Sequence, residues 1–184
     1  GNLDVAAGTV EYDGNGNQII IPDTYYNLSI SNGHKMLSGS TAINGNFTFS
    51  SDHDLITDGH ELTITQTPSG YSDDRLIRGG SSNTVSIKYT SSSTTPCLIP
   101  FGVDGGLRTI GITAASSIAE TYTAVYTPGS PTTIDWNTYP SAGVPVNGAD
   151  MIYVNNDYYY DISRAGSVDA NITMEFNGIT TPSQ

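Results

Sequence analysis

The feature that most constrains the fold of this chain is its division into short runs of β-forming residues. Val, Ile, Thr, Tyr and Phe dominate the runs, and Gly, Asn, Asp or Pro separate them. The first group favours a pleated, half-buried surface and the second favours turns. The runs that predict strands are 9–12, 18–21, 26–30, 47–49, 62–65, 85–89, 107–112, 122–126, 151–154, 158–162 and 172–176. The best helical candidate, 114–120, is short and flanked by β-type residues, so we predict an all-β fold.

The texture of the sequence changes where Pro68 and Gly70 interrupt it. Before this point the runs are very short and their connections are rich in Asn and Gly. Apolar positions recur there roughly every 15–20 residues, which is the scale of one coil of a β-solenoid. These positions are Val10, Leu28, Phe47 and Leu62. We therefore predict a short-strand region over residues 1–68, solenoid-like or, alternatively, a meander of hairpins.

After Gly70 the runs lengthen and the loops contain more proline. Seven or so strands over about a hundred residues are typical of an antiparallel β-sandwich. We predict such a sandwich over residues 69–184. Pro100 interrupts the apolar alternation around it, which indicates an edge or a bulge there. Trp136, the only tryptophan, lies in a loop-like stretch and either covers one end of the core or provides a binding platform.

The charge of the chain excludes two classes of partner. There are 18 acidic and 6 basic residues, which gives a net charge of −12. Nucleic acids and anionic membrane surfaces require clustered cations, so neither is expected as a partner. No apolar run approaches the roughly 20 residues that span a bilayer, so no membrane insertion is expected. The single cysteine, Cys97, excludes an internal disulfide framework, and its apolar neighbours indicate a buried thiol.

Two stretches contain residues that bind cations in other proteins. Asp13, Asn15 and Asn17 alternate with glycines, like the start of an EF-hand loop, although the flanking helices and the bidentate Glu are missing. Calcium at these three residues is the one cofactor that we consider, and a metal-free turn explains the same pattern. The second stretch, residues 52–61, holds His53 and His60 among aspartates, and the third histidine is His34. Zinc needs three or four convergent ligands, which spacing alone does not show.

The sequence contains no recognisable catalytic motif. A Gly-x-Ser-x-Gly elbow and a Gly-rich phosphate loop are both absent. The glutamates occur one at a time, so no pair of carboxylates stands out as a glycosidase centre. The sequence therefore predicts a protein without catalytic activity.

A run of three tyrosines, 158–160, offers a different kind of site. Alternation along a strand sends Tyr158 and Tyr160 to one face and Tyr159 to the other. Outward tyrosines among Asn and Asp are typical of glycan-binding surfaces, whereas inward ones pack the sheet. Tyr158, Tyr160 and Trp136 are therefore the candidate residues of a carbohydrate-binding module.

The first half of the chain contains five short motifs in sequence. They are Gly-Thr-Val-x-Tyr at 8–12, Gln before an apolar triplet at 18–21, Tyr-Tyr-Asn-Leu-x-Ile at 25–30, Lys-x-Leu-x-Gly at 35–39 and Asn-Gly-Asn before an apolar strand at 44–49. Together these motifs resemble a repeat module of large secreted surface adhesins and filament proteins of the Bacteroidota, of the kind exported by type IX secretion. A looser match follows around 99–112, where two expected prolines are missing. The resemblance implies an extracellular structural or adhesive repeat at the cell surface and no catalytic residues.

These observations predict a structural module that contacts copies of itself or neighbouring modules of the same protein through β-strands. We expect the joints in the segments 3–10 and 172–179, near the two ends of the sequence. The residues expected in these joints are Leu3, Val5, Val10, Ile172, Met174 and Phe176. Binding of surface glycans is the alternative function.

Overall fold

The computed structural model describes residues 7–81, 84–91, 93–103, 106–129 and 158–174. Across these residues all regular elements are β-strands, as the sequence predicts. In chain order the strands are β1 (Thr9–Tyr12), β2 (Gln18–Ile20), β3 (Thr24–Tyr25), β4 (Asn27–Ile30), β5 (Lys35–Leu37), β6 (Thr41–Ile43), β7 (Phe47–Phe49), β8 (Leu55–Ile56), β9 (Leu62–Ile64), β10 (Ile77–Arg78), β11 (Val85–Ser91), β12 (Cys97–Val103), β13 (Gly106–Ala114), β14 (Glu120–Pro128), β15 (Tyr158–Arg164) and β16 (Ala170–Met174). The stretch between Ala114 and Glu120 is a bend that connects β13 to β14.

The first nine strands form three stacked coils. Each coil contributes one strand to each of three sheets, and every pairing between successive coils is parallel. We name the sheets A, which contains β1, β4 and β7, B, which begins β2-β5-β8, and C, which begins β3-β6-β9. This winding is a β-solenoid, so the solenoid prediction is confirmed and the alternative of meandering hairpins is wrong.

The apolar recurrence in the sequence corresponds to a ladder inside the coils. Val10 pairs with Leu28, and Leu28 pairs with Phe47, in sheet A. Leu28 and Phe47 are buried, and Val10 packs against the core from the first coil. Leu62, which the sequence placed in the same series, lies in sheet C instead. Coil length varies, so a regular spacing does not always return the chain to the same sheet.

Sheets B and C continue past the third coil and change character. β10 pairs in parallel with β8 and β12, and β11 pairs in parallel with β9. Antiparallel strands then complete the sheets in the orders β12-β13-β16 and β11-β14-β15. The sequence predicted a domain boundary between residues 68 and 69. Sheets B and C both continue across it without a break.

One hydrophobic core runs through both parts. In the antiparallel part, Phe101 of β12 stacks on Tyr126 of β14 with ring centroids 5.8 Å apart. The hydroxyl of Tyr160 on β15 donates a hydrogen bond to the carbonyl oxygen of Arg108 on β13. These contacts join strands of sheet B to strands of sheet C across the interior.

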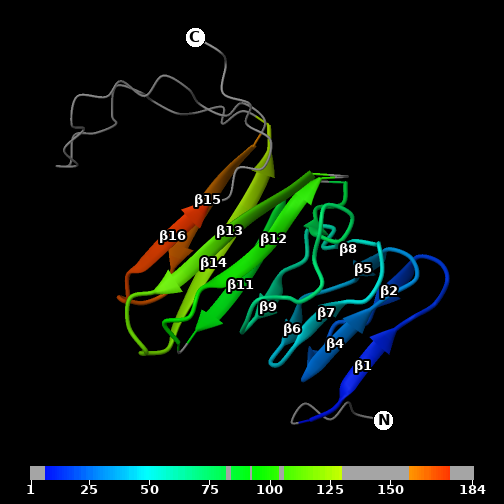
Figure 1. Cartoon of the computed structure of the whole chain (residues 1–184), viewed down its shortest axis with the longest axis horizontal. Coiled ribbons are helices and arrows are strands. Elements are labelled where there is room, and N and C mark those ends of the chain that lie inside the picture. The colour runs from blue at the N-terminus through cyan, green and yellow to red at the C-terminus, as the bar shows by residue number, and fades with distance from the viewer. Residues whose placement is uncertain (1–6, 82–83, 92, 104–105, 130–157, 175–184) are drawn as a thin grey trace.

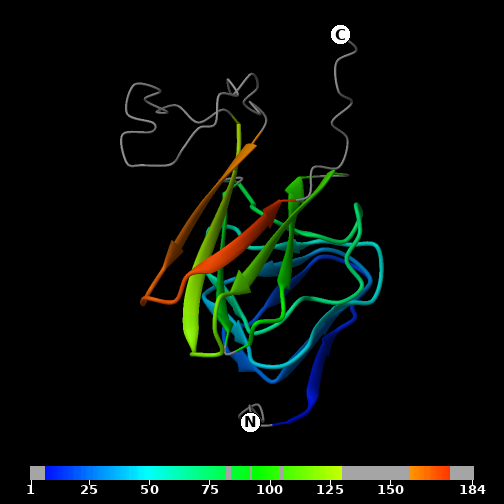
Figure 2. The same ribbon diagram turned by 60° about the vertical axis from the view of Figure 1, so that its left-hand side comes forward.

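The stacking direction coincides with the long direction of the molecule (Figure 1). The strands β1, β2 and β3 lie at one extremity, and β15 and β16 lie at the other. Figure 2 brings β15 and β16 forward, with the coils behind them. The molecule therefore has two distinct ends.

Candidate functional site

In the part of the chain that the structure describes, the strand edges at both ends of the stack have no neighbouring strand. At one end, which we call the coil end, β1, β2 and β3 are the last described strands of sheets A, B and C, respectively. At the other, the antiparallel end, β15 and β16 close sheets C and B. An edge strand presents a row of backbone N–H and C=O groups, which is a template for pairing with another strand.

Exposed apolar side chains lie at both ends, and two others, Val103 and Ile118, lie at the end of β12 and between β13 and β14. At the coil end Ile19 is 56% exposed, and Ile21 and Tyr26 are exposed beside it. At the antiparallel end Ile172 is 38% and Met174 43% exposed.

Natural edge strands are commonly protected by charges or proline. Pro22 and Asp23 precede β3, and β15 contains Asp161 and Arg164, whereas β2 and β16 contain no charged residue or proline.

The assembly strands expected from the sequence are edge strands where the structure describes them. Val10 lies in β1, with its side chain toward the core, and Ile172 and Met174 lie in β16. Leu3, Val5 and Phe176 lie outside the described residues. The sequence did not indicate that β2, β3 and β15 are edges as well, because edge position depends on which strands pair over long distances.

The turn that resembles a calcium loop surrounds a cation that belongs to the chain. The Lys35 ammonium donates hydrogen bonds to the backbone carbonyl oxygens of Gly33 at 2.9 Å, Gly14 at 3.2 Å, Asn32 at 3.2 Å and Gly16 at 3.4 Å. The Lys35 side chain is fully buried. Burial lowers its pKa, and the charge of Asp13 partly opposes that effect.

Calcium at Asp13, Asn15 and Asn17 stays a prediction, and the structure shows the turn already engaged by a cation of the chain. The carbonyl groups of the turn converge on the Lys35 ammonium, and Asp13 acts on it only through its charge. A second coil supplies the cation, because Lys35 on β5 pairs with Gln18 on β2. The Asn and Gly residues therefore form the cage for a lysine.

The histidine and aspartate stretch forms a column that links successive coils. His34 Nδ1 accepts a hydrogen bond from the Asp54 N–H at 3.1 Å, and the ring of His53 lies edge-on to His34 with centroids 5.3 Å apart. The buried Asp54 carboxylate forms an ion pair with Arg78 Nε at 2.9 Å and accepts from the Leu76 N–H at 3.3 Å. His34 and Asp54, two potential zinc ligands, therefore join the second coil to the third and the third coil to the segment of β10.

The tyrosine run alternates as predicted, and its paired members face inward. Tyr158 is 7% exposed, and its ring lies 5.7 Å from that of Tyr160, with the Arg108 guanidinium 5.3 Å from the Tyr158 ring centre. Burial raises the pKa of Tyr160. This corrects the assignment of Tyr158 and Tyr160 to a glycan platform, because they pack the core. Trp136 lies outside the described residues.

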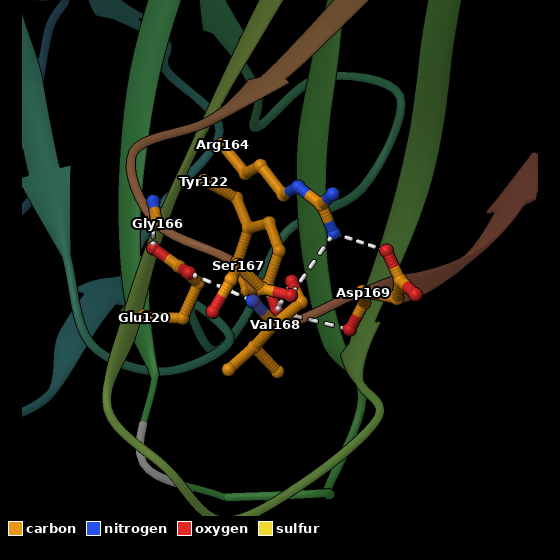
Figure 3. Close-up of polar contacts among 7 residues, drawn as sticks. All are labelled: Glu120, Tyr122, Arg164, Gly166, Ser167, Val168 and Asp169. Carbon is orange, nitrogen blue, oxygen red and sulfur yellow. Dashed lines mark hydrogen bonds and ion pairs between the residues drawn. The ribbon is translucent and has the colours of Figure 1, made fainter.

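A single carboxylate fixes the antiparallel end (Figure 3). Glu120, at the start of β14, accepts hydrogen bonds from the N–H groups of Thr121 and Gly166 at 2.8 Å and of Val168 at 3.1 Å. The Tyr122 hydroxyl donates to the Val168 carbonyl at 3.0 Å. The turn held in this way connects β15 to β16, so the Glu120 clamp sets the relative position of the two end strands.

The hydrogen bonds of the clamp lower the pKa of Glu120. The N–H groups of Thr121 and Val168 favour the charged carboxylate, burial opposes them, and the N–H of Gly166 and the charge of Arg164 add to the lowering. Arg164 in turn forms an ion pair with Asp169 on the same turn. Nothing in the sequence pattern singles out Glu120. Its partners are backbone groups, and two of them, the N–H groups of Gly166 and Val168, lie more than 40 residues away.

The described part of the chain has more than one concave surface, and one of about 250 Å³ includes Asp23 in its lining. A hollow of about 390 Å³ lies beside Cys97 and is lined by neutral residues. These are Thr65, Gln66, Thr67, Tyr89, Ser93, Thr95, Pro96 and Cys97. Cys97 is buried as predicted, and burial raises the pKa of its thiol to about 12, so the thiolate is scarce at neutral pH.

Within the described ranges, no three or more His, Cys, Asp or Glu side chains are grouped to hold a metal ion. The same ranges contain no helix long and apolar enough to cross a membrane. Comparison with protein-family models, with curated proteins and with solved structures found no match for this chain.

Proposed function

We propose that this chain is a non-catalytic structural module of an extracellular, cell-surface assembly, joined to its neighbours through the strand edges at its two ends. The neighbours are further copies of the chain or adjoining modules of a longer surface protein. The observation that carries the proposal is the path of sheets B and C, which run the length of the molecule from β2 and β3 to β16 and β15. Such a stack can be extended at either end without a change in its interior.

The apolar side chains at the two ends support this function. Ile19 and Ile21 at the coil end, and Ile172 and Met174 at the antiparallel end, are exposed next to open edges. Pairing with another strand satisfies the backbone groups of an edge and covers such side chains. The antiparallel strands, which we interpret as a two-sheet sandwich built on the last coil, give the module a second edge of the same kind.

The extracellular location rests on composition and on the resemblance to surface adhesin modules. A net charge of −12 with few basic residues suits a protein that must stay dispersed until it is assembled. Carbohydrate binding is less well supported, because Tyr158 and Tyr160 pack in the interior.

Sedimentation velocity and negative-stain electron microscopy over a range of protein concentrations test the proposal. We expect the wild type to form elongated assemblies as concentration rises. Ile19→Lys places a charge beside the β2 edge and should suppress them, whereas Thr63→Lys, on the outer face of β9 in the middle of sheet C, should not. A wild type that stays monomeric at every concentration would contradict the proposed function.

A further inference from the structure

The directions of the end strands match each other in both sheets. In sheet B, β2, β5, β8, β10 and β12 are all parallel, β13 is antiparallel to β12, and β16 is antiparallel to β13. Two reversals restore the original direction, so β16 runs the same way as β2.

Sheet C gives the same result independently. β3, β6, β9 and β11 are parallel, β14 is antiparallel to β11, and β15 is antiparallel to β14. Therefore β15 runs the same way as β3. One end of the stack presents the same pair of strand directions as the other, at the edges of the same two sheets.

We propose that copies of this chain join head to tail, with β16 of one copy beside β2 of the next and β15 beside β3, both pairs parallel. This inference rests on the proposed function and specifies its partner, a second copy of the chain, and its geometry. Because the two contacting surfaces differ, the contact is heterologous and is repeated along an open filament, in which all copies point the same way.

The size of the joint matches joints that already exist inside the molecule. The pairing of β2 with β5 spans three residues, and that of β3 with β6 spans two. A partner on the other side of β2 and β3 meets edges of these same lengths. The proposed contact thus continues the coil-to-coil interface by one more step.

The side-chain faces also correspond. Ile20 of β2 points into the core and Ile19 points outward. On β16, Ile172 and Met174 pair with the inward-facing Ile112 and Ile110, so they lie on the interior face and Thr173 lies on the outer one. Parallel addition of β2 places the exposed Ile172 and Met174 in line with the interior row of the next copy. Polar Thr173 then stands beside Ile19 on the outer face.

Sheet A does not take part in this joint. Its described strands are β1, β4 and β7, and the strands described at the antiparallel end belong to sheets B and C. The strand-direction argument thus selects β2 and β3, rather than β1, as the joining edges of the coil end.

Two variants that each add one cysteine, Ile19→Cys and Thr173→Cys, test the polarity of the joint by disulfide cross-linking. Residues on one face of adjacent strands lie within the Cα separation that a disulfide spans. The native Cys97 is buried with a raised pKa and does not compete. Asn171→Cys, also on the outer face of β16, covers a shift of register, and Thr63→Cys, in the middle of sheet C, is the control.

Under mild oxidation we expect a covalent dimer as the main product when Ile19→Cys is mixed with Thr173→Cys or Asn171→Cys. Each variant alone, and any mixture with Thr63→Cys, should stay uncross-linked. Dimers of one variant alone, without a mixed product, would mean a symmetric contact and would overturn the head-to-tail inference while leaving assembly intact. Absence of mixed dimers from a wild type that assembles would also overturn it, whereas a wild type that never assembles would refute the proposed function itself.

Discussion

The coils and the antiparallel strands share two sheets but keep their shape by different means. In the coils, most pairings between neighbouring strands are two or three residues long, and corners with buried polar contacts lie between them. In the antiparallel part, β11 with β14 and β12 with β13 each pair over seven residues. Register is therefore set locally by the corners in the first part and by long ladders in the second.

The polar residues reflect this difference. Lys35 and Asp54 are buried in the coils and bind backbone groups or charges of neighbouring coils. The antiparallel part uses one buried carboxylate, Glu120, at the turn where sheet C passes to sheet B. The lesson is that short parallel strands need a specified contact at each corner, whereas long ladders need one only where the chain changes sheet.

Replacing Phe101 should have the largest effect and tests whether the two parts unfold together. Phe101 is fully buried on β12, pairs with Ile77 of β10 and stacks on Tyr126. Phe101→Ala should lower the free energy of unfolding by about 3–5 kcal/mol. Denaturant unfolding followed by far-UV circular dichroism should keep a single transition, with Val103→Ala, at the exposed end of β12, as the mild control. A separate, unshifted transition for the coils would show that the two parts are independent.

A glycine at a coil corner tests the role of close backbone approach. Gly70 has a φ of +74°, and an added Cβ would overlap the Phe49 carbonyl oxygen. Gly70→Ala should cost about 2 kcal/mol or more, from left-handed strain together with the overlap. Gly59 has a φ of +83° but open space around it, so Gly59→Ala should show only the strain, about 1–2 kcal/mol. Urea denaturation measures both variants. If Gly70→Ala and Gly59→Ala lose the same free energy of unfolding, the close approach to the Phe49 carbonyl contributes nothing.

The lysine cage should matter more than a surface lysine. Lys35→Met leaves four carbonyl oxygens, one in a buried and three in part-buried hydrogen bonds, without their donor, so we expect a loss of about 1–3 kcal/mol. Lys88 forms an exposed ion pair with Glu61, and Lys88→Met should change stability by less than about 1 kcal/mol. Thermal unfolding of both variants provides the comparison. A Lys35→Met protein as stable as the wild type would show that the cage is dispensable.

The Glu120 clamp should produce a small and pH-dependent effect. Because folding lowers its pKa, its contribution is present above the pKa of the unfolded chain and is lost as pH falls through the folded value. The wild type should therefore be more stable than Glu120→Gln at neutral pH, and the difference in their free energies of unfolding should disappear below about pH 4. Denaturant titrations across this range measure the difference, with Glu61→Gln as the exposed control. A difference that does not change with pH would contradict the clamp.

Much of the fold could be predicted from the sequence, because short-range patterns determine strands and turns. The runs at 9–12 and 47–49 coincide with β1 and β7, and the Val10–Leu28–Phe47 series is a real ladder. The very short strands, such as β8 and β10, were not predicted, since two residues form no alternation. Pro100 was expected at an edge or a bulge, yet β12 lies inside sheet B. β10 pairs with β12 only at Phe101, so no residue of β10 lies opposite Pro100.

The candidate sites were harder to predict because they depend on contacts between distant residues. The Gly and Asn pattern of the 13–17 turn suggested a calcium loop, and nothing in it indicated that Lys35, in the next coil, donates hydrogen bonds to carbonyl oxygens of the turn. Alternation correctly paired Tyr158 with Tyr160, but the face on which they lie depends on β12 and β14. The edges at the coil end became visible only once the pairing order of the sheets was known.

The central claim is that β2 and β3 at one end, and β15 and β16 at the other, pair between molecules. Amide hydrogen exchange measured against protein concentration tests it most directly. We predict that protection rises with concentration in these four strands and stays unchanged in internal strands such as β8 and β9. Protection that does not depend on concentration in the four strands, in a sample that nonetheless assembles, would contradict the claim.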